Sequence, residues 1–200
     1  RDFGTVKQLK KDVFTETAAT LAFSTIENND KVGVILFSDK IEKFIPPQKG
    51  RKHVLHIIRE LINFTPQSTK TDIGMALKYF TNVIKKSSTA FIISDFMDKG
   101  FERELNVANR KHDIVAFQVC DVRESELPNV GFLKLKDAET DERIWVDTGS
   151  KRLRTIYRNS WNERQFELQK IFAKSGVDFV SMNTSDDYVK ALIKLFKMRA

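Results

Sequence analysis

The sequence predicts a doubly wound α/β fold, in which helices cover both faces of a parallel sheet. Apolar runs occur at 32–37, 90–93 and 114–119, the last interrupted by Gln118 alone, and strands buried on both faces of a parallel sheet need such runs. Segments with helical periodicity alternate with these runs along the chain. This alternation favours right-handed crossovers within one domain.

The first half is expected to form, in order, a helix over 5–28, strands over 32–37 and 41–45, and helices over 54–62 and 71–84. Pro46 and Pro47 are expected to end the second strand, because proline has no N–H to donate to a ladder. Asp72, or Thr71 before it, is expected to cap the last of these helices by accepting hydrogen bonds from the exposed amides at its start.

The second half is expected to form a strand over 90–93, a helix over 101–110, a strand over 114–119, an inserted β-hairpin over about 131–148, a helix over 152–174, a strand over 177–180 and a final helix capped by Ser185. The hairpin is predicted because Leu133 and Leu135 alternate with lysines, and Ile144 and Val146 follow across a polar turn. Gly176 suits the position just past a helix end.

The composition, 200 residues of which 41% are hydrophobic and 30% charged, fits one soluble domain with a substantial core. No apolar run approaches the roughly 20 residues that span a bilayer, and we expect no contact with a membrane. The single cysteine, Cys120, ends an apolar run and is expected to be a small buried side chain, which suits a reducing compartment.

The net charge of +7 and the isoelectric point of about 9.4 invite a nucleic-acid interpretation. The basic residues are scattered over helices and interleaved with acids, however, so a solvated surface is the favoured interpretation. An acidic partner protein would be served equally well.

The candidate functional residue is Asp95, which follows the apolar run 90–93. Ligands of open α/β sheets bind where the strands end, so Asp95 is either a site carboxylate or a cap of the next turn. Asp98 follows three residues later, whereas phosphatases that use two aspartates space them as D-x-D, so this enzyme class is disfavoured. His53, His56 and His112 show no metal-ligand spacing with Cys120.

Four stretches, LFSD, PPQKGRKHVLHIIREL, KTDIGMAL and FIISDFMD, resemble a von Willebrand factor A-like domain. More narrowly, they resemble the bacterial family filed as domain of unknown function 58. The resemblance continues through LPNVGFLKLKDAETDERIWVDT, SGVDF and SDDYVKALIKLF, and so covers essentially all 200 residues. It implies a single Rossmann-like domain of von Willebrand factor A type.

The resemblance also implies a metal-ion-dependent adhesion site for Mg²⁺ or Mn²⁺, with Thr71 and Asp95 as ligands. The family's D-x-S-x-S motif is absent and would directly precede Arg1–Gly4. The first strand that carries this motif lies, in the family, between the strands that begin at Val32 and Thr89. We therefore expect the chain to lack that strand, and an upstream segment or another chain to fill the gap.

The function implied by the resemblance is a non-enzymatic, cytoplasmic protein-interaction module, in which the metal binds an acidic side chain of a partner. Such proteins resemble the companions of MoxR-type AAA+ ATPases in protein maturation. Trp145 and Trp161 could anchor a partner, although packing in the core or the hairpin is favoured. Two alternatives stay open: a Mg²⁺-dependent phosphoesterase that uses Asp95, and a nucleic-acid-binding domain.

Overall fold

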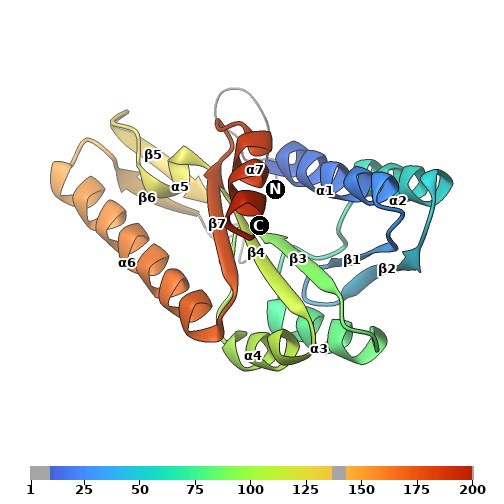
Figure 1. Ribbon diagram of the computed structural model, residues 1–200. Coiled ribbons are helices and arrows are strands. Elements are labelled where there is room, and N and C mark those ends of the chain that lie inside the picture. The colour runs from blue at the N-terminus through green and yellow to red at the C-terminus, as the bar shows by residue number, and fades with distance from the viewer. Residues whose placement is uncertain (1–9, 137–142, 200) are drawn as a thin grey trace.

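The protein is described by a computed structural model that covers residues 10–136 and 143–199 (Figure 1). The helices are α1 (Lys10–Glu27), α2 (Arg51–Asn63), α3 (Ile73–Val83), α4 (Glu102–Lys111), α5 (Val122–Ser125), α6 (Lys151–Ser175) and α7 (Tyr188–Arg199). The strands are β1 (Val32–Phe37), β2 (Ile41–Gln48), β3 (Thr89–Ser94), β4 (Asp113–Cys120), β5 (Phe132–Lys136), β6 (Arg143–Asp147) and β7 (Asp178–Asn183). None of these helices is long and apolar enough to cross a bilayer.

A parallel sheet of three strands, in the order β3-β4-β7, forms the centre of the described structure. β3 pairs with β4 from Thr89 opposite Asp113 to Ser94 opposite Gln118, and β4 pairs in turn with β7. The chain returns between these parallel strands through α4 and α6. The structure therefore confirms a mixed α/β fold with a parallel sheet.

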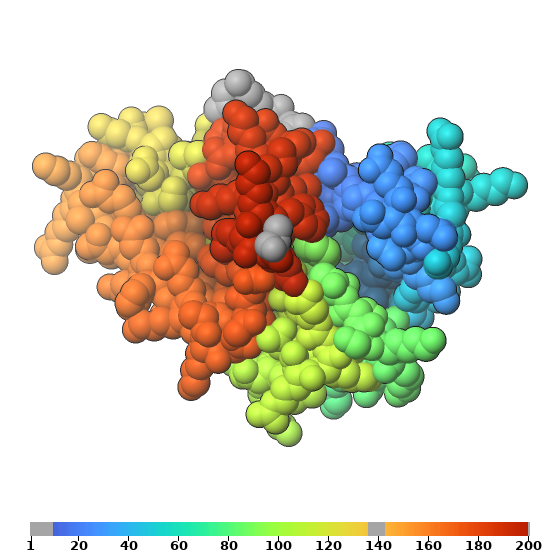
Figure 2. Space-filling view, in the orientation of Figure 1, coloured from blue at the N-terminus to red at the C-terminus, as the bar shows by residue number. Residues whose placement is uncertain are grey.

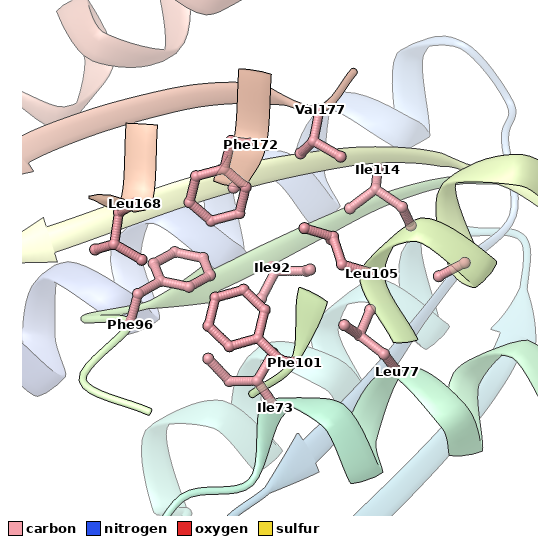
Figure 3. Close-up of a cluster of buried hydrophobic side chains, with 12 residues drawn as sticks. Ile73, Leu77, Ile92, Phe96, Phe101, Leu105, Ile114, Leu168, Phe172 and Val177 are labelled. Carbon is pink, nitrogen blue, oxygen red and sulfur yellow. The ribbon is translucent and has the colours of Figure 1, made fainter. Parts of the chain in front are cut away.

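Helices cover both faces of this sheet. On one face, residues of α3, α4 and α6 pack against the sheet in a cluster that includes Leu77, Leu105, Leu168 and Phe172 (Figure 3). On the other face, α1 and α7 contribute to a second cluster that includes Val13, Leu192 and Leu195. β4 is buried on both faces because its alternate side chains enter the two clusters, and this explains why residues 114–120 are apolar apart from Gln118.

The strands β1 and β2 form a separate antiparallel pair that packs against α1 and α2. The expectation that Pro46 and Pro47 end β2 is wrong, because the strand continues to Gln48. The register shifts where Gly33 faces the prolines, so these two residues lie in a bulge and need not donate to the ladder. A Cβ on Gly33 would lie 2.7 Å from the Ile45 carbonyl oxygen, so only glycine fits this approach.

No ladder joins β1 to β3 among the residues that the structure describes. Both strands nevertheless end at the start of α3: the N–H of Asp72 donates to the carbonyl of Ser38, and the N–H of Ile73 donates to the carboxylate of Asp98. The surface is hollowed between α1 and β3 (Figure 2). That a missing first strand belongs there stays a prediction.

The hairpin forms as expected, with β5 paired to β6 from Phe132 opposite Asp147 to Lys136 opposite Arg143. Its predicted turn at 139–142 lies outside the described residues. Gly176 ends α6 in a left-handed conformation, as predicted. The expected cap Ser185 is wrong: α7 begins at Tyr188, and Oδ1 of Asp187 accepts hydrogen bonds from the first free amides.

Candidate functional site

The candidate site lies at the carboxyl edge, where β3, β4 and β7 end. Asp95 follows the last residue of β3, and its Oδ1 accepts a hydrogen bond from the N–H of Met97 at 3.2 Å. Phe96 lies between them with a positive φ of 53°, which bulky residues rarely adopt. Its side chain is fully buried against Phe101 and Phe172, and this burial offsets the backbone strain.

Hydrogen bonds with three other segments hold this turn in place. The buried Gln118 of β4 donates from Nε2 to the Asp95 carbonyl at 3.1 Å, and Arg164 of α6 donates to the Phe96 carbonyl at 3.1 Å. Asp98 accepts from the N–H of Ile73 at 2.7 Å and thereby ties the turn to the start of α3. The backbone around Asp95 is therefore fixed by the fold.

The carboxylate of Asp95 is paired with a buried cation that the sequence did not indicate. Lys10, with 5% of its side chain exposed, lies 3.2 Å from Oδ2 of Asp95 and also contacts Glu124. Burial disfavours the charged ammonium, but Asp95 and Glu124 attract it more strongly, so the pKa of Lys10 lies above its usual range. Asp95, Lys10 and Glu124 form a charge cluster at this edge.

Glu124 is positioned by a capping box on α5. Asp121, which follows β4 and is fully buried, accepts from the N–H of Arg123 and the hydroxyl of Thr184, while Glu124 accepts from the N–H of Asp121. This short helix was not predicted, although an aspartate three residues before a glutamate is a capping pattern that could have revealed it. Cys120 beside it is buried as expected, and burial raises the pKa of its thiol to about 11.

Thr71, the second expected metal ligand, precedes the cap of α3. Asp72 is that cap, as predicted, because its Oδ1 accepts from the N–H of Met75 at 2.7 Å. The two carboxylate oxygens of Asp98 accept hydrogen bonds from the N–H groups of Ile73 and Lys99. The loop with Thr71 and the turn with Asp95 are therefore neighbours, since the bond from Ile73 to Asp98 joins them.

These residues do not by themselves fit a divalent metal. Mg²⁺ requires octahedral oxygen coordination. The expected ligands within the described part of the chain are one hydroxyl, from Thr71, and one carboxylate, from Asp95, which already binds Met97 and Lys10. Residues 10–136 and 143–199 contain no group of three acidic, histidine or cysteine side chains that could hold a metal. A metal at this edge would need further oxygen ligands and a displaced lysine.

The two tryptophans differ from expectation. Packing in the core or the hairpin was favoured for both, but Trp145 is 68% exposed on β6, so this expectation is wrong for Trp145. Trp161 is half-buried on α6. His56 is exposed on α2, whereas His112 is buried beside Phe80.

Relatives of similar sequence are bacterial proteins. The uncharacterized protein Rv1480 of Mycobacterium tuberculosis is 24% identical over 203 residues, which cover 99% of this chain and 63% of that protein. The uncharacterized protein MAV169 of Mycobacterium avium is 23% identical over 160 residues, covering 78% of this chain and 93% of that protein. The chain thus spans less than two thirds of the length of Rv1480.

Two solved structures share the fold. A conserved hypothetical protein BatB from Bacteroides thetaiotaomicron matches 96% of this chain and 89% of its own, with a TM-score of 0.63 and 15% identity. An aerotolerance-related membrane protein from Bacteroides fragilis matches 92% of this chain and 88% of its own, with a TM-score of 0.56 and 15% identity. At this identity the likeness concerns the fold alone.

The family match extends over most of the elements that build the carboxyl edge. It covers residues 1–167, which include Lys10, Thr71, Asp95 and Glu124 and end within α6. The chain therefore belongs to the family described as protein of unknown function DUF58.

Proposed function

We propose that the protein is a non-enzymatic interaction module of von Willebrand factor A type, which docks a partner at the carboxyl edge around Asp95. The observation that carries this proposal is the constrained turn at 94–98. In this turn Phe96 has a positive φ, and Gln118 and Arg164 donate to the carbonyls of Asp95 and Phe96. The carboxylate of Asp95 is thereby held at the end of a buried strand. Strained turns of this kind cluster at ligand-binding sites, and strand ends are where ligands of such sheets bind.

In this proposal the docking is cation-dependent. Mg²⁺ or Mn²⁺ would be held by Asp95 and Thr71 together with oxygen ligands beyond the described residues, and an acidic side chain of the partner would complete the coordination. Lys10 now neutralises Asp95, so the metal and the lysine compete for the same carboxylate. Once Lys10 is displaced, an acidic partner group would be repelled by Asp95 unless the metal lay between them.

We further propose a cytoplasmic setting and a MoxR-type AAA+ ATPase as the partner. The family resemblance supports this choice, and a surface with a net charge of +7 suits an acidic partner protein. One protein of similar fold is described as an aerotolerance-related membrane protein, so a membrane-anchored version of the module is compatible with the proposal.

The test is binding of the purified chain, extended upstream to include the expected first strand, to a purified MoxR-type ATPase from the same organism, measured by biolayer interferometry in Mg²⁺ and in EDTA. We expect binding in Mg²⁺ only, and its loss in Asp95→Ala. The matched control is Asp30→Ala. Asp30 is an exposed aspartate that precedes β1, and so lies at the end of that strand away from the carboxyl edge. Equal binding by Asp95→Ala would refute the proposed site.

The alternatives give different outcomes. A phosphoesterase would hydrolyse p-nitrophenyl phosphate in a Mg²⁺-dependent manner and would lose this activity in Asp95→Ala. A nucleic-acid-binding domain would bind DNA or RNA with an affinity that falls steeply with salt and does not depend on Asp95.

A further inference from the structure

The β-hairpin carries exposed large hydrophobic side chains on both of its sides, among them the most exposed of the described residues. Phe132 on β5 is 74% exposed and Trp145 on β6 is 68% exposed. Val130 before the hairpin and Ile144 within it are also more than half exposed, at 61% and 59%. Large exposed apolar patches often mark interaction sites, and aromatic residues are enriched among the residues that dominate binding there.

The strand register places the aromatic side chains on one face together with cations. Lys134 is paired with Trp145, Lys136 with Arg143, and Phe132 with Asp147, so Phe132 and Trp145 are diagonal neighbours. Nζ of Lys134 lies 5.7 Å from the centroid of the Trp145 ring. Together, Phe132, Lys134, Arg143 and Trp145 form what we call the hairpin face.

Hydrogen bonds close the base of the hairpin and join it to α6. Thr148, which is fully buried, donates its backbone N–H to the Gly131 carbonyl at 2.8 Å and accepts at its hydroxyl from the N–H of Val130 at 3.1 Å. Arg154 in the first turns of α6 donates to the carbonyls of Thr148 and Gly149. The backbone that carries Phe132 and Trp145 is therefore fixed at its base, which lowers the entropic cost of binding a partner there.

The charge beside the hairpin face is positive. α6 starts four residues after β6, and its first ten residues contain four basic and no acidic side chains, namely Lys151, Arg152, Arg154 and Arg158. Lys151, Arg152 and Arg158 are exposed, as are Lys134 and Arg143. Asp147 is the one acidic side chain among the described residues 130–136 and 143–160. This charge is complementary to an anionic partner.

We propose that the hairpin face and the basic start of α6 dock an acidic segment of a partner protein that also carries apolar side chains. Apolar groups of the segment would cover Phe132 and Trp145, while its carboxylates would pair with the surrounding lysines and arginines. A protein segment is favoured over a nucleic acid because the exposed Asp147, paired with Phe132, would oppose an extended polyanion, whereas a peptide can place an uncharged side chain there.

This surface does not involve Asp95, so its test is independent of the metal-dependent site. A phage library of random twelve-residue peptides is selected on the whole chain in EDTA, with counter-selection on the double variant Phe132→Ser/Trp145→Ser. Enriched sequences are expected to be net acidic and to contain apolar residues. Synthetic copies should bind the double variant at least about tenfold more weakly, should lose affinity with salt, and should bind Asp95→Ala normally.

The matched control is Phe166→Ser. Phe166 is also an exposed aromatic residue of α6 with a lysine over its ring, at 58% exposure and 4.1 Å from Nζ of Lys170, but Glu163 and Glu167 flank it. This variant should bind the peptides as the unmodified chain does. In a Trp161→Phe background, Trp145 is the single tryptophan, and its emission should shift to shorter wavelength when a peptide binds.

Four outcomes would overturn the proposal. The first is that no enriched peptide distinguishes the double variant, and the second is that the enriched peptides lack acidic residues. The third is self-association in sedimentation velocity that the double variant loses, which would assign the surface to a second copy of the chain. The fourth is co-sedimentation with vesicles of phosphatidylcholine and phosphatidylglycerol that the double variant loses, which would assign it to a lipid surface.

Circular dichroism of both variants excludes a folding defect, and little change is expected because these side chains are exposed.

Discussion

Replacement of Lys10 by methionine tests the charge cluster at the carboxyl edge. Methionine keeps the apolar stem of the side chain and removes the ammonium that pairs with Asp95 and Glu124. Loss of one partner of a fully buried ion pair costs about 3–5 kcal/mol. The side chains of Asp95 and Glu124 are 34% and 19% exposed, so water compensates part of this loss, and we expect a lower free energy of unfolding by roughly 2 kcal/mol.

The assay is urea unfolding, with the fall of the transition midpoint measured at unchanged slope. The control is Lys11→Met, because Lys11 is exposed at the next position of α1 and should cost little. Glu124→Gln keeps the amide-accepting oxygen of the capping box but removes a charge, so it should cost less in the Lys10→Met background than in the unmodified chain. If Lys10→Met and Lys11→Met lower the free energy of unfolding equally, or if the losses in the Lys10→Met/Glu124→Gln double variant are fully additive, the charge cluster does not stabilise the fold.

Three further predictions concern the body of the fold. Thr17→Val should raise the free energy of unfolding by about 1 kcal/mol in urea titrations, because the Thr17 hydroxyl is buried and has no hydrogen-bond partner among the described residues. Gly33→Ala should lower it by about 1–3 kcal/mol in the same assay, because the new Cβ would lie 2.7 Å from the Ile45 carbonyl oxygen at the β1–β2 bulge. His112 is buried, and burial lowers its pKa below the usual 6.5, so the unfolded chain takes up a proton before the folded chain does. Stability should therefore fall as the pH drops below about 6.5, and His112→Phe should remove that share of the pH dependence in unfolding titrations from pH 7.5 to 5.5.

The parts of the fold that the sequence predicted depend on local patterns. β4 was predicted because a strand covered on both faces needs a mostly apolar run, and the structure covers both faces. Asp72 and Gly176 were predicted because caps depend on chemistry within one helical turn. Asp95 was placed correctly at the end of β3 for the same reason: the apolar run stops there.

The parts that were missed depend on contacts between distant segments. Lys10 meets Asp95 and Glu124 across 85 and 114 residues of chain, and nothing in its neighbours indicates that a lysine is buried. The positive φ of Phe96 is tolerated only because a distant core accepts its ring. The continuation of β2 through two prolines required the bulge opposite Gly33, which belongs to the other strand.

The central claim, a cation-dependent docking site at Asp95, is tested most directly by calorimetric titration of Mn²⁺ and Mg²⁺. The titration is made on this chain and on one extended upstream, as the expectation of a missing first strand requires, each with Asp95→Ala and with the Asp30→Ala control. We expect the extended chain to bind the metal. Asp95→Ala should abolish this binding, and Asp30→Ala should leave it unchanged. An extended chain that binds no metal, or an Asp95→Ala variant that binds it equally well, would contradict the claim.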